Sequence, residues 1–552
     1  MKVIIVGGVA GGASCAARLR RLDEHAEIVI IERGPYISYA NCGLPYHVGG
    51  IIEKESSLLA ATAETFRAQF NIDVRLHCEV TGISRAPKTV DFKDRASGKV
   101  TTTSYDKLVL SPGAFPIRPK LPGIDLPGIF TVRTIPDARA IRQWLSSGAA
   151  RKKRAVVVGG GFIGLEMVEN LVHLGLDVTL IEKMDQLMPP LDPDMASLVE
   201  ERVVRNGVEV KLNDGIAGFR SATGGLIEVL TENAKVYPAD VVVLAIGVRP
   251  ETELAKLAGI AIGERGGIKV DDQMRTSDPD IFAVGDAVEV KDVVTGAWTL
   301  VPLAGPANRQ GRIAADVIAG RKSRFRGTQG TSICQVFGSA VASTGVNEKT
   351  LKKMGDTDYE KIYLFPPSHA GYYPGAKTLT VKFLFRKSDG RVLGAQVLGE
   401  DGVPARIDAF AMAIQMGATV YDLEESELCY APPFGSAKDP VNFAGMIAAN
   451  VLRTDMPVAH WDALGEGFLL DVRNPPELSV EAVAGAVNIP LAQLRSRLNE
   501  LPRDKEILVT CRSAQRAYYA TRLLLQNGFK AKNISGGILS RAMIVPKGSG
   551  RD

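Results

Sequence analysis

Two segments of the chain repeat the same order of apolar and polar positions. In each, a run of aliphatic residues is followed by a glycine-rich turn, an amphipathic stretch and a second aliphatic run that ends in a glutamate. The first segment covers residues 3–32 and the second covers residues 155–182. Continuous apolar runs that alternate with helical patterns are typical of parallel strands buried on both faces. The pattern therefore predicts two α/β units built on parallel sheets.

The rest of the chain has two regions of different pattern. Residues 326–450 contain strand-like runs such as TLTVKFLF and VLGAQVLG, and residues 461–552 form a last unit of αβ pattern. The polar, proline-containing stretch RTDMPVAHWD lies between them, and we interpret residues 451–460 as a linker. We expect the terminal KGSGRD to be frayed. A chain of 552 residues is too long for a single core, which agrees with several domains.

Composition narrows the class of protein. A hydrophobic content of 45% with 23% charged residues is that of a soluble globular protein, and no apolar run reaches the about 18 residues of a membrane span. The N-terminus runs straight into a strand-like pattern without a cationic leader, so we expect a cytoplasmic protein. The net charge of +4 suits an anionic ligand and does not call for nucleic acid. Six cysteines without CxxC spacing argue against a disulfide framework or a zinc site, so we expect no metal.

The second glycine-rich turn has the spacing of a dinucleotide-binding site. Gly159 allows the tight turn, Gly161 lets the backbone approach a pyrophosphate, and Gly164 lets helix and strand pack closely. Glu182 ends the next strand, where an acid accepts hydrogen bonds from a ribose diol, which favours NADH over NADPH. The adjacent Lys183 weakens that preference. The helix that starts at this turn adds the candidate residues Phe162, Ile163 and Glu166.

The first glycine-rich turn is less regular, because Val9 occupies the position of its second glycine. Four later segments nevertheless resemble those of flavoproteins with two dinucleotide-binding domains: LVLSPGAFP, VVVLAIGVRP, TSDPDIFAVGDAVE and PLAGPANRQGR. By this resemblance the first site binds FAD, with Glu32 at the adenosine ribose and Asp286 at the ribityl chain. The other residues assigned to this site are Gly7, Gly8, Ala10, Gly11, Gly12, Arg33, Ser111, Gly113, Gly247, Gly285, Pro302, Leu303 and Ala304.

The stretch SYANCGLPY follows the first glutamate, where the pyridine nucleotide-disulfide reductases carry their redox cysteine. The resemblance to that family covers about residues 1–450 and implies that Cys42 lies beside the flavin. Members with two cysteines have the second one five positions later, and here that position is His47. A single thiolate cannot store two electrons as an intramolecular disulfide. Its oxidised form must be a mixed disulfide or persulfide, which implies a thiol-type substrate, or a sulfenic acid, which implies a peroxidase or oxidase.

The first turn also helps to choose between these substrates. Flavin peroxidases and oxidases with one cysteine carry a histidine in this turn, whereas this chain has Ala10. The turn GGVAGG together with Ser38, Asn41 and Cys42 in the pattern SxxNC resembles the coenzyme A-disulfide reductases instead. That subgroup is homodimeric by resemblance, and its ligand is coenzyme A. The phosphates of coenzyme A could meet Arg18 and Arg20, and a solvated helix face is the alternative for these arginines.

Tyrosines near the dimer interface are thought to assist at the sulfur in the coenzyme A-disulfide reductases. The segments HAGYYPGA and CYAPPFGSAKDPV match those that carry them. The match gives Tyr430 and one of Tyr372 and Tyr373, of which we favour Tyr372. Packing is the alternative role for tyrosines in such loops.

The C-terminal 90 or so residues resemble single-domain rhodaneses through FLLDVRNPPEL, GAVNIPL and ILVTCRSAQRA. Cys511 ends a strand pattern and begins a loop that leads into a helix, and successive backbone N–H groups in such a loop can stabilise a thiolate. Arg512 and Arg516 add positive charge for a thiolate or persulfide. The aromatic residue often found after NISGG is absent here, which leaves the sulfur donor open.

These features predict an α/β protein with two Rossmann-like domains, an α+β dimerisation domain and a rhodanese-like α/β domain. We assign residues 1–112 and 246–325 to FAD binding, 113–245 to NAD(P)H binding, 326–450 to dimerisation and 461–552 to the rhodanese-like domain. The hypothesis is an NAD(P)H-dependent reductase of coenzyme A persulfide or disulfide, with polysulfide as a further substrate. Two alternatives remain: an NADH oxidase or peroxidase that uses a Cys42 sulfenate, and a sulfur carrier or redox sensor with a flavin scaffold.

Overall fold

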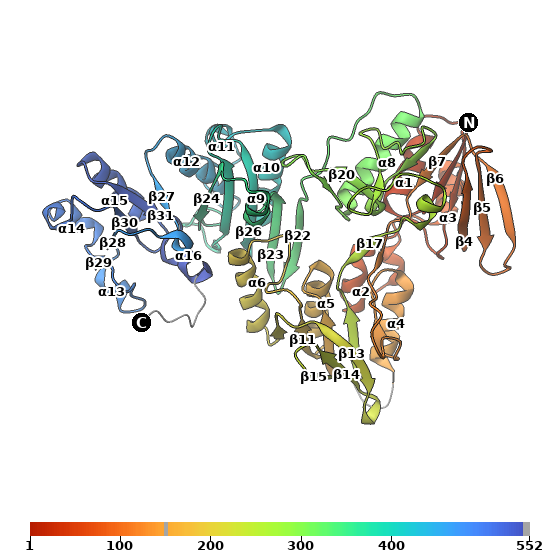
Figure 1. Ribbon diagram of the computed structural model, residues 1–552, viewed down its shortest axis with the longest axis horizontal. Helices are drawn as coiled ribbons and strands as arrows, with labels where there is room; N and C mark the ends of the chain where they lie inside the picture. Colours follow the sequence, from red (N-terminus) through yellow and green to blue (C-terminus); the bar gives the residue numbers. More distant parts are fainter. Residues whose placement is uncertain (148–152, 545–552) are drawn as a thin grey trace. The chain divides into compact units, whose positions relative to one another are not determined.

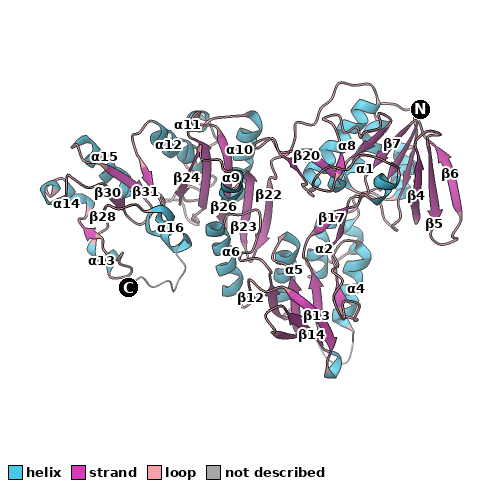
Figure 2. Ribbon diagram, viewed as in Figure 1, coloured by secondary structure: helices cyan, strands magenta, loops and turns pink. Residues whose placement is uncertain are grey.

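The structure is a computed structural model that describes residues 1–147 and 153–544, so the expected fraying of KGSGRD lies outside the described residues. The chain divides into two compact units, which are described separately (Figures 1 and 2). The first unit comprises Met1–Leu187 and Val204–Gly330, and the second comprises Met188–Val203 and Thr331–Asp552. Within the described ranges, no helix has both the length and the apolar character that crossing a membrane requires.

The first unit begins with a five-stranded parallel sheet that contains the first predicted α/β segment. Its strand order is β19-β7-β1-β2-β3, with β1 at Lys2–Val6, β2 at Glu27–Ile31, β3 at Asp73–Arg75, β7 at Lys107–Leu110 and β19 at Ile281–Ala283. Helices α1 (Ala10–Arg20) and α8 (Ala304–Ile318) pack against each other. A Cβ atom on Gly311 of α8 would lie 2.2 Å from the carbonyl oxygen of Gly11, so this glycine allows the close approach.

The second predicted α/β segment forms another five-stranded parallel sheet in the same unit. Its order is β12-β11-β10-β16-β9, with β9 at Ile129–Phe130, β10 at Arg154–Val158, β11 at Asp177–Ile181, β12 at Glu209–Lys211 and β16 at Val241–Leu244. Helices α4 (Ile135–Ser146) and α5 (Phe162–His173) belong to this part of the chain. Glu32 and Glu182 directly follow β2 and β11, as the sequence pattern predicts.

Smaller elements complete the first unit. Antiparallel sheets are formed by β4 (Cys78–Ser84), β5 (Thr89–Asp94) and β6 (Val100–Ser104), and by β13 (Ile216–Ser221), β14 (Ile227–Thr231) and β15 (Val236–Ala239). The remaining strands are β8 (Ala114–Pro116), which pairs with β17 (Val248–Pro250), and β18 (Ile268–Lys269), β20 (Val288–Lys291) and β21 (Trp298–Thr299). The remaining helices are η1 (Asn41–Gly43), α2 (Leu44–Val48), η2 (Glu55–Leu58), α3 (Ala63–Phe70), η3 (Thr223–Gly225), α7 (Glu253–Leu257) and η4 (Gly285–Ala287).

The second unit contains a five-stranded antiparallel sheet. Its order is β22-β23-β26-β25-β24, with β22 at Ser332–Val336, β23 at Ser339–Gly345, β24 at Tyr359–Leu364, β25 at Thr380–Arg386 and β26 at Val392–Gly399. Its helices are α9 (Glu348–Met354), α10 (Val403–Met416), α11 (Val420–Glu425), α12 (Pro440–Leu452) and most of α6 (Pro193–Arg205).

The C-terminal α/β module belongs to the second unit as well. Its parallel sheet has the order β27-β31-β30-β28-β29, with β27 at Val458–Ala459, β28 at Phe468–Asp471, β29 at Val487–Asn488, β30 at Ile507–Thr510 and β31 at Ala531–Ile534. Its helices are η5 (Trp461–Ala463), α13 (Pro475–Leu478), α14 (Leu491–Leu494), η6 (Leu498–Glu500), α15 (Gln515–Gln526) and α16 (Gly537–Ile544). The predicted linker 451–460 is therefore largely ordered, because α12 ends within it and β27 joins the module's sheet.

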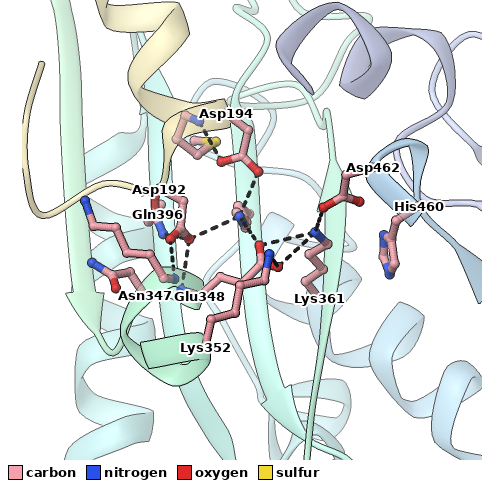
Figure 3. Close-up of polar contacts among 12 residues, drawn as sticks. Asp192, Asp194, Asn347, Glu348, Lys352, Lys361, Gln396, His460 and Asp462 are labelled. Carbon is pink, nitrogen blue, oxygen red and sulfur yellow. Dashed lines mark hydrogen bonds and ion pairs between the residues drawn. The ribbon is translucent and has the colours of Figure 1, made fainter. Parts of the chain in front are cut away.

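A buried network of charges lies in the second unit (Figure 3). Lys382, 1% exposed, contacts Asp192 at 3.1 Å and Asp194 and Glu348 at 2.7 Å. Lys361 contacts Glu348 at 3.0 Å and Asp462 at 2.8 Å. Burial of charge is costly unless each charge finds partners, so the network holds together segments that are far apart in the sequence. The observed elements confirm the predicted mixed α/β fold with an antiparallel domain and a C-terminal α/β module.

Candidate active sites in the two units

A cavity of about 340 Å³ opens at the first glycine-rich turn. Predicted residues that line it include Gly7, Gly11, Glu32, Ser111, Gly113, Gly285 and Asp286. The carboxylate of Glu32 is buried and accepts hydrogen bonds from the N–H groups of Gly8 at 2.9 Å and Gly34 at 2.7 Å. Within the described residues no side chain caps the N-terminus of α1 by a hydrogen bond, and its first turn contains no acidic residue. Backbone N–H groups at the start of this helix are therefore available to an anion. A glycine turn, a free helix start and an acid at the next strand end fit an adenine dinucleotide.

The cavity also shows residues that sequence reasoning missed. Arg133 lines it and donates a hydrogen bond to the carbonyl oxygen of Ala114 at 2.5 Å. Burial raises the pKa of Asp286, and the charge of Arg133 opposes that rise. Arg33, which was predicted here, forms a two-pronged ion pair with Glu251 at 2.6 and 2.7 Å. Arg133 and Glu251 stand outside every motif, so their place in the cavity becomes visible only in the folded chain.

The second glycine-rich turn has the geometry of its motif. Gly159 has a φ of +104°, and a Cβ on Gly164 would lie 1.9 Å from the carbonyl oxygen of Gly159. A Cβ on Gly161 would meet nothing within 4 Å, which leaves the approach to the helix start open. The Glu182 carboxylate accepts hydrogen bonds from Gly160 at 2.6 Å and Met184 at 2.8 Å. Lys183 turns to Glu232 at 2.7 Å, so its charge is already paired beside this site.

Cys42 lies in the short helix η1, directly after the cavity-lining Asn41. Its side chain is exposed, and its thiol is 3.9 Å from Asn41 Oδ1. Desolvation by neighbouring atoms raises the pKa of Cys42, and the charges of Glu166 and Asp286 add to that rise. Burial and the two carboxylates therefore disfavour the thiolate form of Cys42, and a backbone hydrogen bond opposes them.

The helix that follows Cys42 connects it to the second glycine-rich helix. The Tyr46 hydroxyl on α2 donates to Oε1 of Glu166 on α5 at 3.4 Å. Burial raises the pKa of Glu166 to about 7. His47, at the position of the missing second cysteine, is buried; its Nδ1 lies 2.7 Å from the Ile52 carbonyl oxygen and 3.1 Å from Arg142. His47 is thus held by contacts within the fold, and α2, the helix that follows Cys42, offers Cys42 no cysteine partner.

The predicted tyrosines lie in the second unit. The hydroxyls of Tyr372 and Tyr430 are 2.5 Å apart, and both side chains are exposed. Their mutual hydrogen bond raises the pKa of Tyr372. Tyr373 instead packs edge-on against the ring of His369. Two exposed phenols bonded to each other present a polar pair at the surface of this unit.

The C-terminal module places Cys511 at the end of β30, in a loop that leads to α15. Its buried sulfur accepts a hydrogen bond from the backbone N–H of Ala517 at 3.3 Å. Arg516 forms a two-pronged pair with Glu477 at 2.6 and 2.7 Å, which raises the pKa of Arg516 and lowers that of Glu477 to about 2. Arg512 is exposed. The loop therefore places the start of α15 and the charge of Arg516 beside the Cys511 sulfur.

Arg18 and Arg20, which were predicted to meet the phosphates of coenzyme A, have contacts within the fold. Arg18 pairs with Asp316 of α8 at 2.7 Å. Arg20 is buried and donates to five backbone carbonyl oxygens, those of Asp23, Glu24, Ala26, Phe70 and Asn71. A guanidinium whose donors are all used inside the fold is not available to a phosphate, so we do not carry Arg20 into the proposed function. Cys15 is fully buried, which raises its pKa to about 12 and makes it a packing residue.

Comparison with known protein families matches three segments. The pyridine nucleotide-disulphide oxidoreductase model matches residues 1–311, the dimerisation domain of that family matches residues 331–440, and the rhodanese-like domain matches residues 457–540. A coenzyme A disulfide reductase of Staphylococcus haemolyticus is 35% identical over 451 residues, which are 82% of this chain and 100% of that protein. An NADH oxidase of Methanocaldococcus jannaschii is 36% identical over 450 residues, 80% of this chain and 98% of its own.

Two solved structures are similar to this chain over nearly its whole length, including the rhodanese-like domain. The reduced CoADR-RHD of Bacillus anthracis has a TM-score of 0.96 at 46% identity and covers 99% of this chain and 98% of its own. The NAD-dependent persulfide reductase of A. fulgidus has a TM-score of 0.90 at 38% identity and covers 98% and 100%. The predicted resemblance is thereby confirmed. The chain belongs to the pyridine nucleotide-disulphide oxidoreductase family and carries that family's dimerisation domain followed by a rhodanese-like domain.

Proposed function

We propose that the protein is an FAD-dependent NAD(P)H reductase of coenzyme A persulfide or disulfide, in which Cys42 attacks the sulfur–sulfur bond. The observation that carries the proposal is the place of Cys42, an exposed thiol next to cavity-lining Asn41 with a buried histidine where a second cysteine would stand. Two similar proteins support this choice of substrate, because one is named a coenzyme A disulfide reductase and the other an NAD-dependent persulfide reductase.

Each of the two glycine-rich turns would bind a different cofactor. Gly7, Gly11, Glu32, Ser111 and Asp286 would hold FAD, which when bound supplies two-electron transfer between a nicotinamide and a sulfur. Gly159, Gly161, Gly164 and Glu182 would hold the nicotinamide nucleotide. The Glu182 carboxylate would repel a 2′-phosphate, so we propose NADH as the preferred donor.

Cys42 would act as the nucleophile in a thiol–disulfide exchange. Its thiolate attacks one sulfur of the substrate, the old sulfur–sulfur bond breaks, and a new bond joins Cys42 to that sulfur while the other sulfur leaves as a thiolate. The neighbouring Ser38 and Asn41 would orient the substrate at this position. Tyr372 and Tyr430, whose hydroxyls share a hydrogen bond, would supply a proton to the leaving thiolate in a homodimer.

Cys511 would carry sulfane sulfur as a persulfide. The Ala517 N–H, which already donates to the Cys511 sulfur, would stabilise a persulfide anion, and Arg512 and Arg516 would add positive charge to it. The long pantetheine arm of coenzyme A could move sulfur between Cys511 and Cys42. All six cysteines are free, which supports a protein of a reducing compartment, and we propose a cytoplasmic one.

A second candidate is an NADH oxidase that forms a sulfenate at Cys42. The exposed thiol and the relative from Methanocaldococcus jannaschii favour it, whereas Ala10 in the first turn disfavours it. NADH-dependent oxygen or peroxide consumption without added thiol would identify this activity.

Steady-state assays of two single variants test the proposal. Cys42→Ser should lose NADH-dependent reduction of coenzyme A persulfide and disulfide. Cys511→Ser should keep disulfide reduction and lose sulfur transfer from a persulfide donor. Undiminished persulfide reduction by Cys42→Ser would end the proposed role of Cys42.

A further inference from the structure

Strand β24 is an edge strand of the antiparallel sheet, and residues of the rhodanese-like module contact it. His460 Nε2 lies 2.8 Å from Oε1 of Glu360, and Asp462 Oδ2 lies 2.8 Å from Nζ of Lys361. The backbone N–H of Tyr363 donates to the Ser535 hydroxyl at 3.0 Å. An edge strand has N–H groups without a neighbouring strand, and here the module supplies one of the acceptors.

The contact between Asp462 and Lys361 continues the buried charge network (Figure 3). Lys361 is 7% exposed and binds Glu348 as well as Asp462, and Glu348 in turn binds Lys382. Such a network tolerates few arrangements, because a displaced partner would leave a charge buried without compensation. The segment from His460 to Asp462 is therefore fixed to β24.

The turn after β31 is packed between β24 and the loop of Cys511. A Cβ on Gly536 would lie 2.8 Å from Cβ of Tyr363, and a Cβ on Gly537 would lie 2.1 Å from the carbonyl oxygen of Cys511. Both glycines have positive φ, +74° and +58°. Neither side of the turn has space for a side chain, so a displacement on the β24 side is transmitted to the Cys511 side.

Hydrogen bonds connect this turn to the reactive loop. The N–H of Ile538 donates to the Cys511 carbonyl at 2.9 Å, and the N–H of Leu539 donates to the Arg512 carbonyl at 3.0 Å. On the other side, Nε1 of Trp461 donates to the carbonyl of Gly537 at 2.7 Å. Trp461 stands between His460 and Asp462 in the chain, the two residues that bind β24.

We propose that Trp461 is a positioning residue for the Cys511 loop, and that strand β24 completes the sulfur-carrying site through it. The proposal rests on the proposed function only in giving Cys511 a sulfur-carrying role. The Gly537 carbonyl accepts from the Trp461 N–H and also from the Ser540 hydroxyl at 2.9 Å. Loss of the Trp461 N–H removes the donor that comes from the β24 side, so the turn is held less tightly and the backbone N–H groups around Cys511 stabilise an anion less well. The position of the Cys511 loop in the rhodanese-like module then depends on strand β24 of the antiparallel sheet.

The test is the pH dependence of Cys511 alkylation by iodoacetamide in the full-length protein, followed by mass spectrometry of the Cys511 peptide. Trp461→Phe removes the donor and keeps the ring. Asp462→Asn removes the charge that faces Lys361. Trp298→Phe, in the first unit between Lys269 and Lys291, is the matched control.

We expect alkylation of Cys511 near neutral pH to be about two- to tenfold slower in Trp461→Phe, the effect of one lost hydrogen bond. The midpoint of its pH profile should move upward, Asp462→Asn should shift in the same direction, and the control should match the wild type. NADH-dependent flavin bleaching should be unchanged in all three. Unchanged Cys511 profiles in both variants, or an equal loss of reactivity at every pH, would overturn the proposal.

The outcome is independent of the proposed function. The alkylation profile does not involve a sulfur donor, so a negative result leaves the role of Cys511 as a carrier untouched. Undiminished sulfur transfer by Cys511→Ser would remove that role and leave the positioning result standing.

Discussion

The hydroxyl of Tyr46 donates a hydrogen bond to Glu166 at 3.4 Å, and this contact joins the helix that follows Cys42 to the helix of the second glycine-rich turn. Burial raises the pKa of Glu166 to about 7, so its charge changes near neutral pH. Because a nearby negative charge disfavours a thiolate, the ionised Glu166 raises the pKa of Cys42.

Glu166→Gln should therefore lower the pKa of Cys42. Alkylation of Cys42 should be faster in the variant at about pH 8, where the wild-type carboxylate is ionised, and the difference should shrink at about pH 6, where it is protonated. Peptide mass spectrometry separates Cys42 from the exposed Cys429. Slower alkylation of the variant at high pH would contradict the electrostatic role of Glu166.

Glu182→Gln should change the choice of nucleotide. The amide keeps the shape and loses the charge, so kcat/KM for NADH should fall about tenfold and that for NADPH should rise, since one charged hydrogen bond is worth about 1.5 kcal/mol or more. Stopped-flow flavin reduction with each nucleotide measures both. Glu232→Gln is the control that only frees Lys183, and it should favour NADPH slightly. If the ratio of kcat/KM for NADPH to kcat/KM for NADH were the same in Glu182→Gln as in the wild type, the assignment of Glu182 to the nucleotide site would be wrong.

Local patterns were sufficient for the two nucleotide units, because a strand, a turn, a helix and a terminal acid are neighbours in the sequence. Local patterns did not predict the place of Arg20. The run of cationic residues around it shows that this part of the sequence is charged, but it does not show which face of α1 packs against the rest of the fold. Arg133, Glu251 and Lys382 were also missed, since their partners lie in distant segments and no spacing rule connects them. Within the predicted linker 451–460, β27 is a short strand that pairs with β31, and no local pattern in the sequence indicates that pairing.

Lys382→Met should destabilise the second unit strongly. The change leaves Asp192, Asp194 and Glu348 close together without their central cation, and breaking a buried charge pair costs about 3–5 kcal/mol. Lys352→Met is the matched control, because Lys352 binds the same Glu348 but is 58% exposed, and it should cost less than about 1 kcal/mol. Urea unfolding followed by hydrogen exchange of β24 and β25 amides measures the difference. If the two substitutions lowered the free energy of unfolding equally, the buried Lys382 would not stabilise the unit more than the exposed Lys352 does.

Ala514→Gly should stabilise the Cys511 loop. Ala514 has a φ of +68°, a left-handed conformation that costs an alanine about 1–2 kcal/mol, and part of this gain is offset by the greater freedom of glycine in the unfolded chain. We expect a net gain of up to about 1 kcal/mol in the local opening free energy of α15, measured by hydrogen exchange. Ala520→Gly within α15 should instead lower protection. Lower protection in Ala514→Gly would show that the loop carries no strain.

In the proposed mechanism, Cys42 takes one half of the substrate into a covalent bond. Its most direct measurement is the mass of the Cys42 peptide after the oxidised protein has met coenzyme A disulfide, before and after addition of NADH. We expect a mixed disulfide between Cys42 and coenzyme A that disappears when NADH is added. Continued NADH-dependent turnover of coenzyme A disulfide by Cys42→Ser, with no adduct on any cysteine of the wild type, would contradict it.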